Sequence, residues 1–448
     1  MNYFKKLFYL TVCTFLFALT ACEKDSEELR TYEVSVQLVY PNDAAIEPIV
    51  GVKVTLKNAN EYVFETVTDE DGLAKFDVPI GLYEAAANEK RALEGTLYLL
   101  NGIKSNIQVG NDWDPASVVN VEMTKSEKKQ VIIKELYMGG ITNEDGKSYL
   151  YDRYVILYNN SDQVAVLDDL CLGAAIPANS NQTNKDYDAN GKLFYEAEGW
   201  IPAGHSIWHL SRTLTMEPYS QTVIVLGAAI DHSTVYPESV NLANSSYYVT
   251  YDSEAGFTHA SWYPAPYSGI STTQYFDGYM YGLGNGWAAL SSTGPTFFIF
   301  TLKNTDPTTF VNDVALDDYH GGGISKSSLR KKVPVEWVID GMEVFRADAT
   351  ENYKRLTPAV DGGYVYLINN KGYSNYRNVD KEATEAIEAN KDKLIYNYNL
   401  GVEVNGSPST DPSGIDAEAS IKNGAKIIYL DTNNSGNDFH LRGKVSLK

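Results

Sequence analysis

The chain has 448 residues, of which 44% are apolar and 21% are charged, so it is long enough for two or three domains and can bury a core. It carries 37 Lys and Arg against 58 Asp and Glu, a formal net charge of -21. This acidity argues against nucleic-acid binding, because such binding depends on cationic side chains that neutralise phosphates. The composition fits neither a membrane-spanning bundle nor a disordered chain.

Residues 1–21 predict a bacterial lipoprotein signal peptide. Lys5 and Lys6 precede an apolar run over residues 7–18, which is too short to span a bilayer of about 30 Å as a helix. The run is followed by Leu-Thr-Ala-Cys, ending at Cys22, which matches the lipobox of bacterial lipoproteins. We therefore expect cleavage before Cys22 and attachment of a lipid, including a fatty acid such as palmitate, to this residue.

Residues 22–30 predict a lipidated cysteine followed by an acidic tether. The sequence Glu-Lys-Asp-Ser-Glu-Glu follows Cys22, and a charged stretch of this kind is solvated. Removal of Lys5 and Lys6 with the signal lowers the net charge from -21 to -23. The acidic cluster resembles the export signal that sends lipoproteins of some anaerobic Gram-negative bacteria to the outer face of the outer membrane. The resemblance implies cell-surface exposure, and the periplasmic face stays open as the alternative.

A small β-sandwich is expected over residues 31–125. Alternation of apolar and polar residues predicts strands over residues 32–40, 51–56, 62–67 and 74–78, with another strand beginning at Gly81. Residues 68–72, Thr-Asp-Glu-Asp-Gly, supply a turn. The patterns "GV-V-L" and "T-DG-A-F-V--G-Y" in this order resemble prealbumin-like or Cna-B-like modules of secreted bacterial proteins. The resemblance implies a spacer or stalk.

A second, larger β domain is expected over residues 130–448, after a short linker at residues 126–130. The segment from Ile132 to Leu170, with a strand at residues 154–160, is similar to the opening of lamin-tail-type Ig-like domains. Arg153 stands where that family usually has an acidic residue, and Cys171 replaces the usual Trp. The resemblance therefore implies an Ig-like fold, and these departures leave any ligand of that family unsupported.

The rest of the chain predicts β structure with long insertions. Further strands are expected over residues 221–226, 296–302, 335–339 and 365–368, and one helix over residues 380–393, with Asp380 as its N-cap. The fold class is therefore all-β: a small Ig-like or prealbumin-like sandwich followed by a larger, loop-elaborated, lamin-tail-like sandwich. The missing repeat of about 40 residues argues against a propeller without excluding one.

The whole chain also resembles a family of uncharacterised outer-membrane lipoproteins from such anaerobes. The segments that carry this resemblance are residues 376–385 and 431–440. Because the family is uncharacterised, this resemblance implies no activity for the chain.

Asp186, Asp188 and Asn190 form the best candidate metal site. Oxygen ligands at alternate positions followed by Gly191 suit a loop that curls around Ca²⁺. However, position twelve of the loop is Ala197, so the closing carboxylate of an EF-hand is out of register. A looser structural Ca²⁺ site and an ordinary turn both stay open.

The segment from Trp262 to Trp287 is the best candidate for ligand binding. Eight of its 26 residues are aromatic and only Asp277 is charged, while its glycines disfavour a helix. Aromatic rings bury a large area at low entropic cost, which suits sugar rings, flat cofactors or protein partners. The residues that we expect to bind are Trp262, Tyr263, Tyr279, Tyr281 and Trp287. The alternative is that the loop packs over the sandwich.

Features that resemble catalytic sites are incomplete. His320 precedes three glycines, as in the oxyanion loop of esterases, but the sequence has no Gly-x-Ser-x-Gly nucleophile motif. Cys171 lies between apolar residues, which favours a core thiol. Asp317 and Asp318 are candidate carboxylates for a glycosidase-like hydrolase. Such an enzyme requires two carboxylates about 5–10 Å apart in a cleft.

We therefore expect a non-enzymatic, surface-facing lipoprotein whose larger domain binds a ligand or partner while the smaller domain holds it off the membrane. Lipoproteins of this kind commonly work with TonB-dependent outer-membrane transporters, so the resemblance implies such a transporter as the partner. A structural adhesin or matrix component is the first alternative and a carboxylate-dependent hydrolase the second. No cofactor is expected except Ca²⁺.

Overall fold

The computed structural model describes residues 30–41, 46, 48–60, 62–93, 96–127, 129–181, 184–283, 287, 289, 291–292 and 294–448. The predicted signal peptide, Cys22 and the tether up to residue 29 lie outside these ranges. Within them, none of the helices has the length and apolar character needed to cross a bilayer. The predicted all-β class is confirmed, since strands dominate throughout and helices are short.

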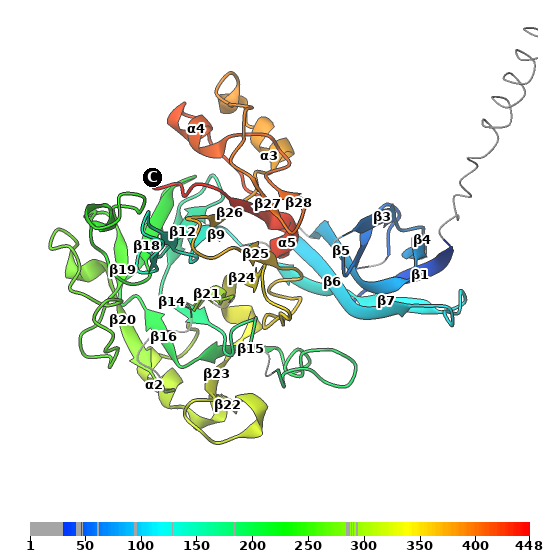
Figure 1. Cartoon of the computed structure of the whole chain (residues 1–448), viewed down its shortest axis with the longest axis horizontal. Coiled ribbons are helices and arrows are strands. Elements are labelled where there is room, and N and C mark those ends of the chain that lie inside the picture. Colours follow the sequence, from blue (N-terminus) through cyan, green and yellow to red (C-terminus); the bar gives the residue numbers. More distant parts are fainter. Residues whose placement is uncertain are drawn as a thin grey trace, which may run out of the picture.

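Residues 31–127 form a two-sheet sandwich, called the module below (Figure 1, blue to cyan). Its strands are β1 (Thr31–Val39), β2 (Lys53–Asn58), β3 (Val63–Val67), β4 (Leu73–Pro79), β5 (Gly81–Leu93), β6 (Thr96–Val109), β7 (Val118–Glu122) and β8 (Thr124–Glu127). One sheet has the order β4-β1-β7 and the other β3-β2-β5-β6-β8. Strand β8 pairs with β6 and occupies the start of the predicted linker.

The sequence pattern explains the module directly. In β1, Val34, Val36 and Leu38 are buried and face the other sheet, as the alternation predicts. The predicted turn forms because the Asp69 carboxylate accepts the Leu73 N–H at 2.9 Å, and the chain reverses before β4. The predicted strands begin and end within two residues of those in the structure, except for β5, whose end was not predicted.

Residues 129–448, called the body below, are built on one sheet of twelve strands. These strands are β9 (Val131–Tyr137), β12 (Tyr154–Asn159), β14 (Leu170–Ala174), β16 (Ser206–His209), β18 (Gln221–Val225), β19 (Tyr248–Thr250), β20 (Tyr275–Met280), β21 (Thr296–Thr301), β24 (Val338–Arg346), β25 (Val365–Leu367), β26 (Ser374–Arg377) and β29 (Phe439–Arg442). Their order is β25-β24-β21-β14-β16-β20-β19-β18-β12-β9-β26-β29. The sheet is rolled, so that β24 lies beside β9 and β25 beside β29. A continuous twelve-stranded sheet differs from the separate blades of a propeller.

Shorter elements surround this roll (Figure 1). The remaining strands are β10 (Ile141–Thr142), β11 (Ser148–Tyr149), β13 (Ala165–Leu167), β15 (Trp200–Gly204), β17 (Leu214–Met216), β22 (Asp317–Tyr319), β23 (Leu329–Pro334), β27 (Val402–Val404) and β28 (Ser407–Ser409). The α-helices of the described ranges are α2 (Pro307–Asn312), α3 (Lys381–Glu385), α4 (Ala417–Lys422) and α5 (Ser435–Asp438). The 3-10 turns are η1 (His232–Thr234), η2 (Thr272–Gln274), η4 (Val314–Leu316), η5 (His320–Gly322), η6 (Val335–Trp337) and η7 (Glu388–Asn390).

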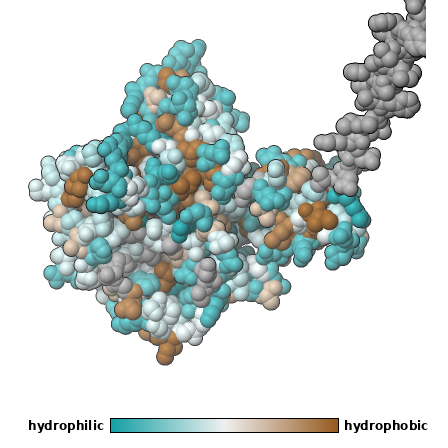
Figure 2. All heavy atoms as spheres, viewed as in Figure 1, coloured by the Kyte–Doolittle hydropathy of each residue, from teal (hydrophilic) through white to brown (hydrophobic). Residues whose placement is uncertain are grey.

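Both faces of the central strands are buried. In β12, Val155 and Leu157 point into the core inside the roll, while Ile156 and Tyr158 pack against loops outside it. Strand β9 is buried along its whole length in the same way. This explains why β9 and β12 read as continuous apolar runs rather than as alternating ones. On the face drawn in Figure 2, brown hydrophobic residues are scattered among hydrophilic ones.

Side chains close the roll where strands do not pair. Asp340 in β24 accepts the Ile133 N–H of β9 at 2.6 Å. Arg377 in β26 donates to the Ile133 carbonyl at 2.6 Å and forms an ion pair with Asp340. Asp431 and Asp438 lie 3.5 and 3.6 Å from the same guanidinium. Because these groups are almost fully buried, the main chain of Ile133 depends on them for its hydrogen bonds.

Two predicted elements differ from the structure. The helix expected over residues 380–393 begins as predicted, with Asp380 capping the Ala383 N–H, but α3 ends at Glu385. The chain turns there because the Asn390 amide donates to the carbonyls of Thr384 and Lys426, both at 2.7 Å. The strand expected over residues 335–339 is the turn η6 followed by the start of β24 at Val338. Strands β23 and β24 belong to different sheets, so the chain must change direction between them.

Replacing Arg377 by Leu should destabilise the body strongly. The variant leaves three buried carboxylates without their cation, which costs about 3–5 kcal/mol of unfolding free energy. Urea unfolding followed by tryptophan fluorescence measures this loss. Arg346→Leu is the control, because its ion pair with Asp348 is partly exposed and should change stability by less than about 1 kcal/mol. Equal effects of the two variants would contradict the closing role of Arg377.

Stability should fall as pH rises from about 4 to about 7. Burial raises the pKa of Asp340 to about 7 and that of Asp438 to about 6, above the value of about 3.9 in an unfolded chain. The folded state therefore binds protons more tightly, and its advantage is lost as pH rises through this window. Urea titrations across the window measure the slope. In Asp340→Asn the slope should be shallower, and an unchanged slope would refute the assignment.

Candidate functional site

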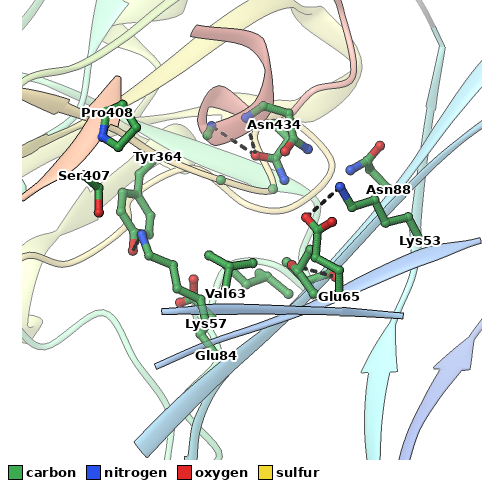
Figure 3. A pocket seen from close by; sticks show the side chains of 17 residues that line it. Lys53, Lys57, Val63, Glu65, Glu84, Asn88, Tyr364, Ser407, Pro408 and Asn434 are labelled. Carbon is green, nitrogen blue, oxygen red and sulfur yellow. Dashed lines mark hydrogen bonds and ion pairs between the residues drawn. The ribbon is translucent and has the colours of Figure 1, made fainter. Parts of the chain in front are cut away.

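A groove runs between the module and the body, and we call it the joint groove (Figure 3). Its volume is about 470 Å³. The floor comes from β2, β3, β5 and β6, and the opposite wall comes from the body. The floor residues are Lys53, Thr55, Lys57, Val63, Glu65, Glu84, Ala86, Asn88 and Ile103, and the wall residues are Gly362, Gly363, Tyr364, Ser407, Pro408, Asn434, Gly436 and Asn437.

The joint groove continues past Tyr364 into a second recess of about 410 Å³. The two spaces share Lys57, Tyr364, Ser407 and Asn437, among others. The second recess is also lined by Tyr366, Ser409, Thr410, Asn378 and His440. Burial lowers the pKa of His440 to about 3, so this imidazole is neutral at physiological pH. Together the two spaces form one elongated, open channel.

A few polar contacts hold the two sides of the groove together. The amide of Asn101, which is fully buried in β6, donates to the Thr432 carbonyl at 2.6 Å. Gly362 allows this approach, because a Cβ there would lie 3.0 Å from the Asn101 Cβ. At the rim, Lys57 Nζ lies 3.4 Å from the Tyr364 hydroxyl, and Lys90 pairs with Asp380 at 3.2 Å. The groove therefore exists only when module and body are docked.

The body wall is rigid because a buried carboxylate organises it. Asp361 accepts the N–H groups of Gly363 at 2.9 Å and Ser435 at 2.7 Å. Asn434 caps α5 by accepting the Gly436 N–H at 3.0 Å. Gly363 must be glycine, since a Cβ would lie 1.9 Å from the Asn434 side-chain oxygen. Burial raises the pKa of Asp361.

The floor carries both signs of charge in equal number. Lys53 pairs with Glu65 at 2.6 Å, as Figure 3 shows. Lys57 lies directly opposite Glu84 in the β2–β5 ladder, and Glu84 also accepts the Ser105 hydroxyl at 2.7 Å. The floor is thus electrically balanced within a strongly acidic chain.

Tyr364 is the aromatic centre of the groove. Its ring stacks on Phe345 with centroids 4.1 Å apart and planes at 14°, which fixes its orientation. Tyr366 meets it edge-on at 5.6 Å. The Lys57 ammonium lies 5.2 Å from the Tyr364 ring centre and 5.7 Å from that of Tyr366. The cation and the two rings form one cluster at the point where the two recesses meet.

The predicted calcium loop has its first carboxylate engaged by cations. Asp186 is fully buried and lies 3.0 Å from both Arg330 and Arg355. Asp188 accepts the N–H groups of Asn190 at 2.8 Å and Lys192 at 2.9 Å, as in an Asx turn. Among the described residues, no three His, Cys, Asp or Glu side chains are grouped as metal ligands. Calcium binding at Asp186, Asp188 and Asn190 stays a prediction, and an ion there would compete with two arginines.

The tip of this loop instead reaches the module. Lys192 forms an ion pair with Glu122 of β7, and Lys104 of β6 donates to the Asn190 carbonyl at 3.4 Å. Beneath it lies another recess of about 610 Å³, lined in part by Trp113, Leu193, Leu356 and Pro358. The loop therefore links body and module at a second place.

The predicted aromatic residues are divided between two clusters. Trp262, Tyr263 and Trp287 pack with the core inside the roll, and the Tyr263 hydroxyl accepts the main-chain N–H of Trp287 at 3.2 Å. The Arg153 guanidinium lies 4.8 Å above the Trp262 ring. Tyr279 and Tyr281 pack on the outer side of β14 and β21, and Tyr281 donates to the Ala203 carbonyl at 2.9 Å. Residues 284–286 of this segment lie outside the described ranges. Ligand binding by these five rings stays a prediction.

The carboxylates considered for hydrolysis are paired with buried cations. Asp318 accepts from Arg330 Nε at 2.8 Å, and Asp317 forms an ion pair with Lys331. Cys171 is fully buried, and burial raises the pKa of its thiol. These groups therefore have structural partners.

The joint groove was not predicted from the sequence. Lys57 and Glu84 stand at ordinary strand positions, and Tyr364 follows an ordinary pair of glycines. Their proximity depends on how the module docks on the body. The glycine pair, Gly362 and Gly363, is the one local signal for a close approach of backbone segments.

Comparisons with known proteins link the chain to a family of unknown function. Residues 217–398 match the model of a family described as protein of unknown function DUF4876. A solved DUF4876 family protein from Bacteroides thetaiotaomicron is similar to the chain, with a TM-score of 0.50 and 19% identity over 91% of this chain and 94% of that one. No curated protein matches the chain.

Two proposed adhesins from Bacteroides ovatus were also found. One has a TM-score of 0.19 and 9% identity, covering 78% of this chain and 98% of its own, and the other has 0.17 and 8%, covering 69% and 87%. Scores this low carry no argument about the fold of this chain. The likeness to the Bacteroides thetaiotaomicron structure supports the fold described above, and residues 217–398 match the DUF4876 family.

Proposed function

We propose that the chain is a non-enzymatic, lipid-anchored protein of the outer membrane that binds a ligand in the joint groove. The observation that carries the proposal is that two parts with separate cores meet across an elongated polar channel, lined from both sides. Binding sites commonly lie at such boundaries between domains. The ligand then contacts both parts at once and favours their docked arrangement.

A binding role is favoured over hydrolysis by the state of the carboxylates. Asp317 and Asp318 are neutralised by neighbouring cations, whereas a general acid or nucleophile must face the substrate. In the groove itself, Glu65 is engaged by Lys53, and Glu84 lies opposite Lys57. This arrangement supports recognition by hydrogen bonds.

The lipid anchor and the partner complete the proposal. The chain enters β1 at Thr31, so a lipid on Cys22 would tether the module rather than the body to the membrane. Delivery of the ligand to a TonB-dependent transporter is also part of the proposal, and it rests on the family resemblance alone. A structural adhesin or matrix role is the alternative if the groove takes no ligand.

Cys22→Ser should release the protein from the membrane fraction and abolish incorporation of radiolabelled palmitate. Only the sulfur at this position can carry the thioether-linked lipid, and a stable anchor needs its acyl chains. Cys171→Ala is the matched control, because that thiol is buried in the body. Unchanged membrane partitioning of Cys22→Ser would refute the anchor. Protease digestion of intact cells then tests exposure at the cell surface.

Filling the joint groove should abolish ligand capture. Ala86 lies in the floor on β5, so Ala86→Trp places a large ring in the channel. The purified, immobilised chain is incubated with three separate pools: neutral saccharides, charged saccharides and a peptide digest. We expect the chain to retain at least one pool and Ala86→Trp to retain none.

Lys75→Trp is the control for this experiment. Lys75 is exposed on β4, in the other sheet of the module. The substitution therefore adds the same ring away from the groove. Matching thermal unfolding of the two variants shows that both are folded. Equal capture by Ala86→Trp and Lys75→Trp, or no capture by the parent chain, would argue for the structural alternative.

A further inference from the structure

We propose that the ligand of the joint groove is a neutral, extended oligosaccharide. This inference rests on the function proposed above and names the chemical class of the ligand. It follows from the charge of the groove, from its hydrogen-bonding groups and from the pairing of the strands beneath it.

The charge balance argues against an ionic ligand. The floor holds two lysines and two glutamates, and Lys53 and Glu65 already neutralise each other. Among acidic and basic side chains, the lining of the second recess adds only His440, and its imidazole is neutral. A polyanion would be repelled by a chain of net charge -21, while a polycation would find many more acidic surfaces elsewhere on it. Neither sign of charge is selected by the groove.

The lining argues against an apolar ligand and for hydroxyl groups. Thr55 and Ser407 contribute hydroxyls, of which that of Thr55 also donates to the Ala86 carbonyl at 3.3 Å, and Asn88 and Asn437 contribute amides. Such groups both donate and accept hydrogen bonds, as sugar hydroxyls do. Tyr364 adds an aromatic ring that Phe345 holds in place. Rigid rings beside a set of donors and acceptors suit sugar recognition, because little side-chain entropy is lost on binding.

The strand pairing argues against a peptide that adds a strand to β2 or β5. Extended peptides are usually bound by hydrogen bonds to a free strand edge. In the groove floor, β2 is paired with β3 and β5, and β5 is paired with β2 and β6. The backbone groups of β2 and β5 are therefore engaged in ladders on both sides, whereas β3, which also contributes to the floor, is the edge strand of this sheet. A ligand that lies over β2 and β5 must therefore be recognised by side chains.

The shape of the channel favours an extended chain over a single sugar. From Lys53 to Lys57, β2 alone spans about 13 Å at roughly 3.3 Å per residue. The channel then continues through the second recess to Ser409 and Thr410. A linear oligosaccharide would thus contact the module first and the body further along. Tyr364 lies where the two recesses join.

Isothermal titration calorimetry tests the proposal with defined probes. These are linear neutral oligosaccharides of glucose, mannose, galactose or xylose, with oligogalacturonate and a peptide digest as comparisons. We expect at least one neutral probe to bind, with an affinity that is unchanged between low and high salt, because no charges attract it. Ala86→Trp and Tyr364→Ala should each weaken binding by roughly tenfold or more, whereas Lys75→Trp should leave it unchanged.

The other outcomes separate this inference from the proposed function. Groove-dependent binding of oligogalacturonate or peptide, without any neutral probe, would overturn the saccharide assignment and leave the binding function intact. Failure of every probe and every pool would overturn both. A neutral probe that binds equally well to Ala86→Trp would place the saccharide elsewhere and also refute the inference.

Discussion

The rolled sheet of the body depends on a buried guanidinium between three carboxylates. Where β9 and β24 come together, their backbones do not pair. The N–H of Ile133 therefore donates to Asp340, and its carbonyl accepts from Arg377. Burying these charges is costly, and the geometry must offset that cost through direct hydrogen bonds. Asp438, at the end of α5, joins the same cluster, and α5 begins beside the Asn434 cap in the groove wall. Closure of the roll and placement of the wall therefore share one electrostatic centre.

The sequence predicts the elements better than their arrangement. Alternation in β1 and the Asp69 turn are local features, so the bounds of β1 to β4 and the start of β5 were predicted within two residues, while β6, β7 and β8 were not predicted. Asp380 was recognisable as an N-cap, but the early end of α3 depends on Asn390 meeting Lys426, 36 residues away. Closure of the roll likewise depends on contacts between distant residues. Asp340 pairs with Arg377 and accepts the N–H of Ile133, which lies 207 residues away in the sequence. Local sequence patterns do not indicate such long-range contacts.

The candidate site shows the same limit. The alternating pattern from Asp186 to Gly191 is shared by calcium loops and Asx turns, and the presence of Arg330 and Arg355 around Asp186 depends on partners 144 and 169 residues away. Aromatic richness between Trp262 and Trp287 predicts burial and binding equally well, because both use the same rings. The joint groove has no sequence signature, since it arises only when two separately cored parts dock.

The first strand of the module has a mechanical consequence. Strand β1 is the centre of its sheet, antiparallel to β4 and parallel to β7, and the chain enters it at Thr31. Tension applied at that end runs along the strand and loads the hydrogen bonds on both sides in shear. Many bonds must then break together rather than one after another. A body pulled by flow or by a bulky cargo would therefore strain the module as a single unit before any of it unravels.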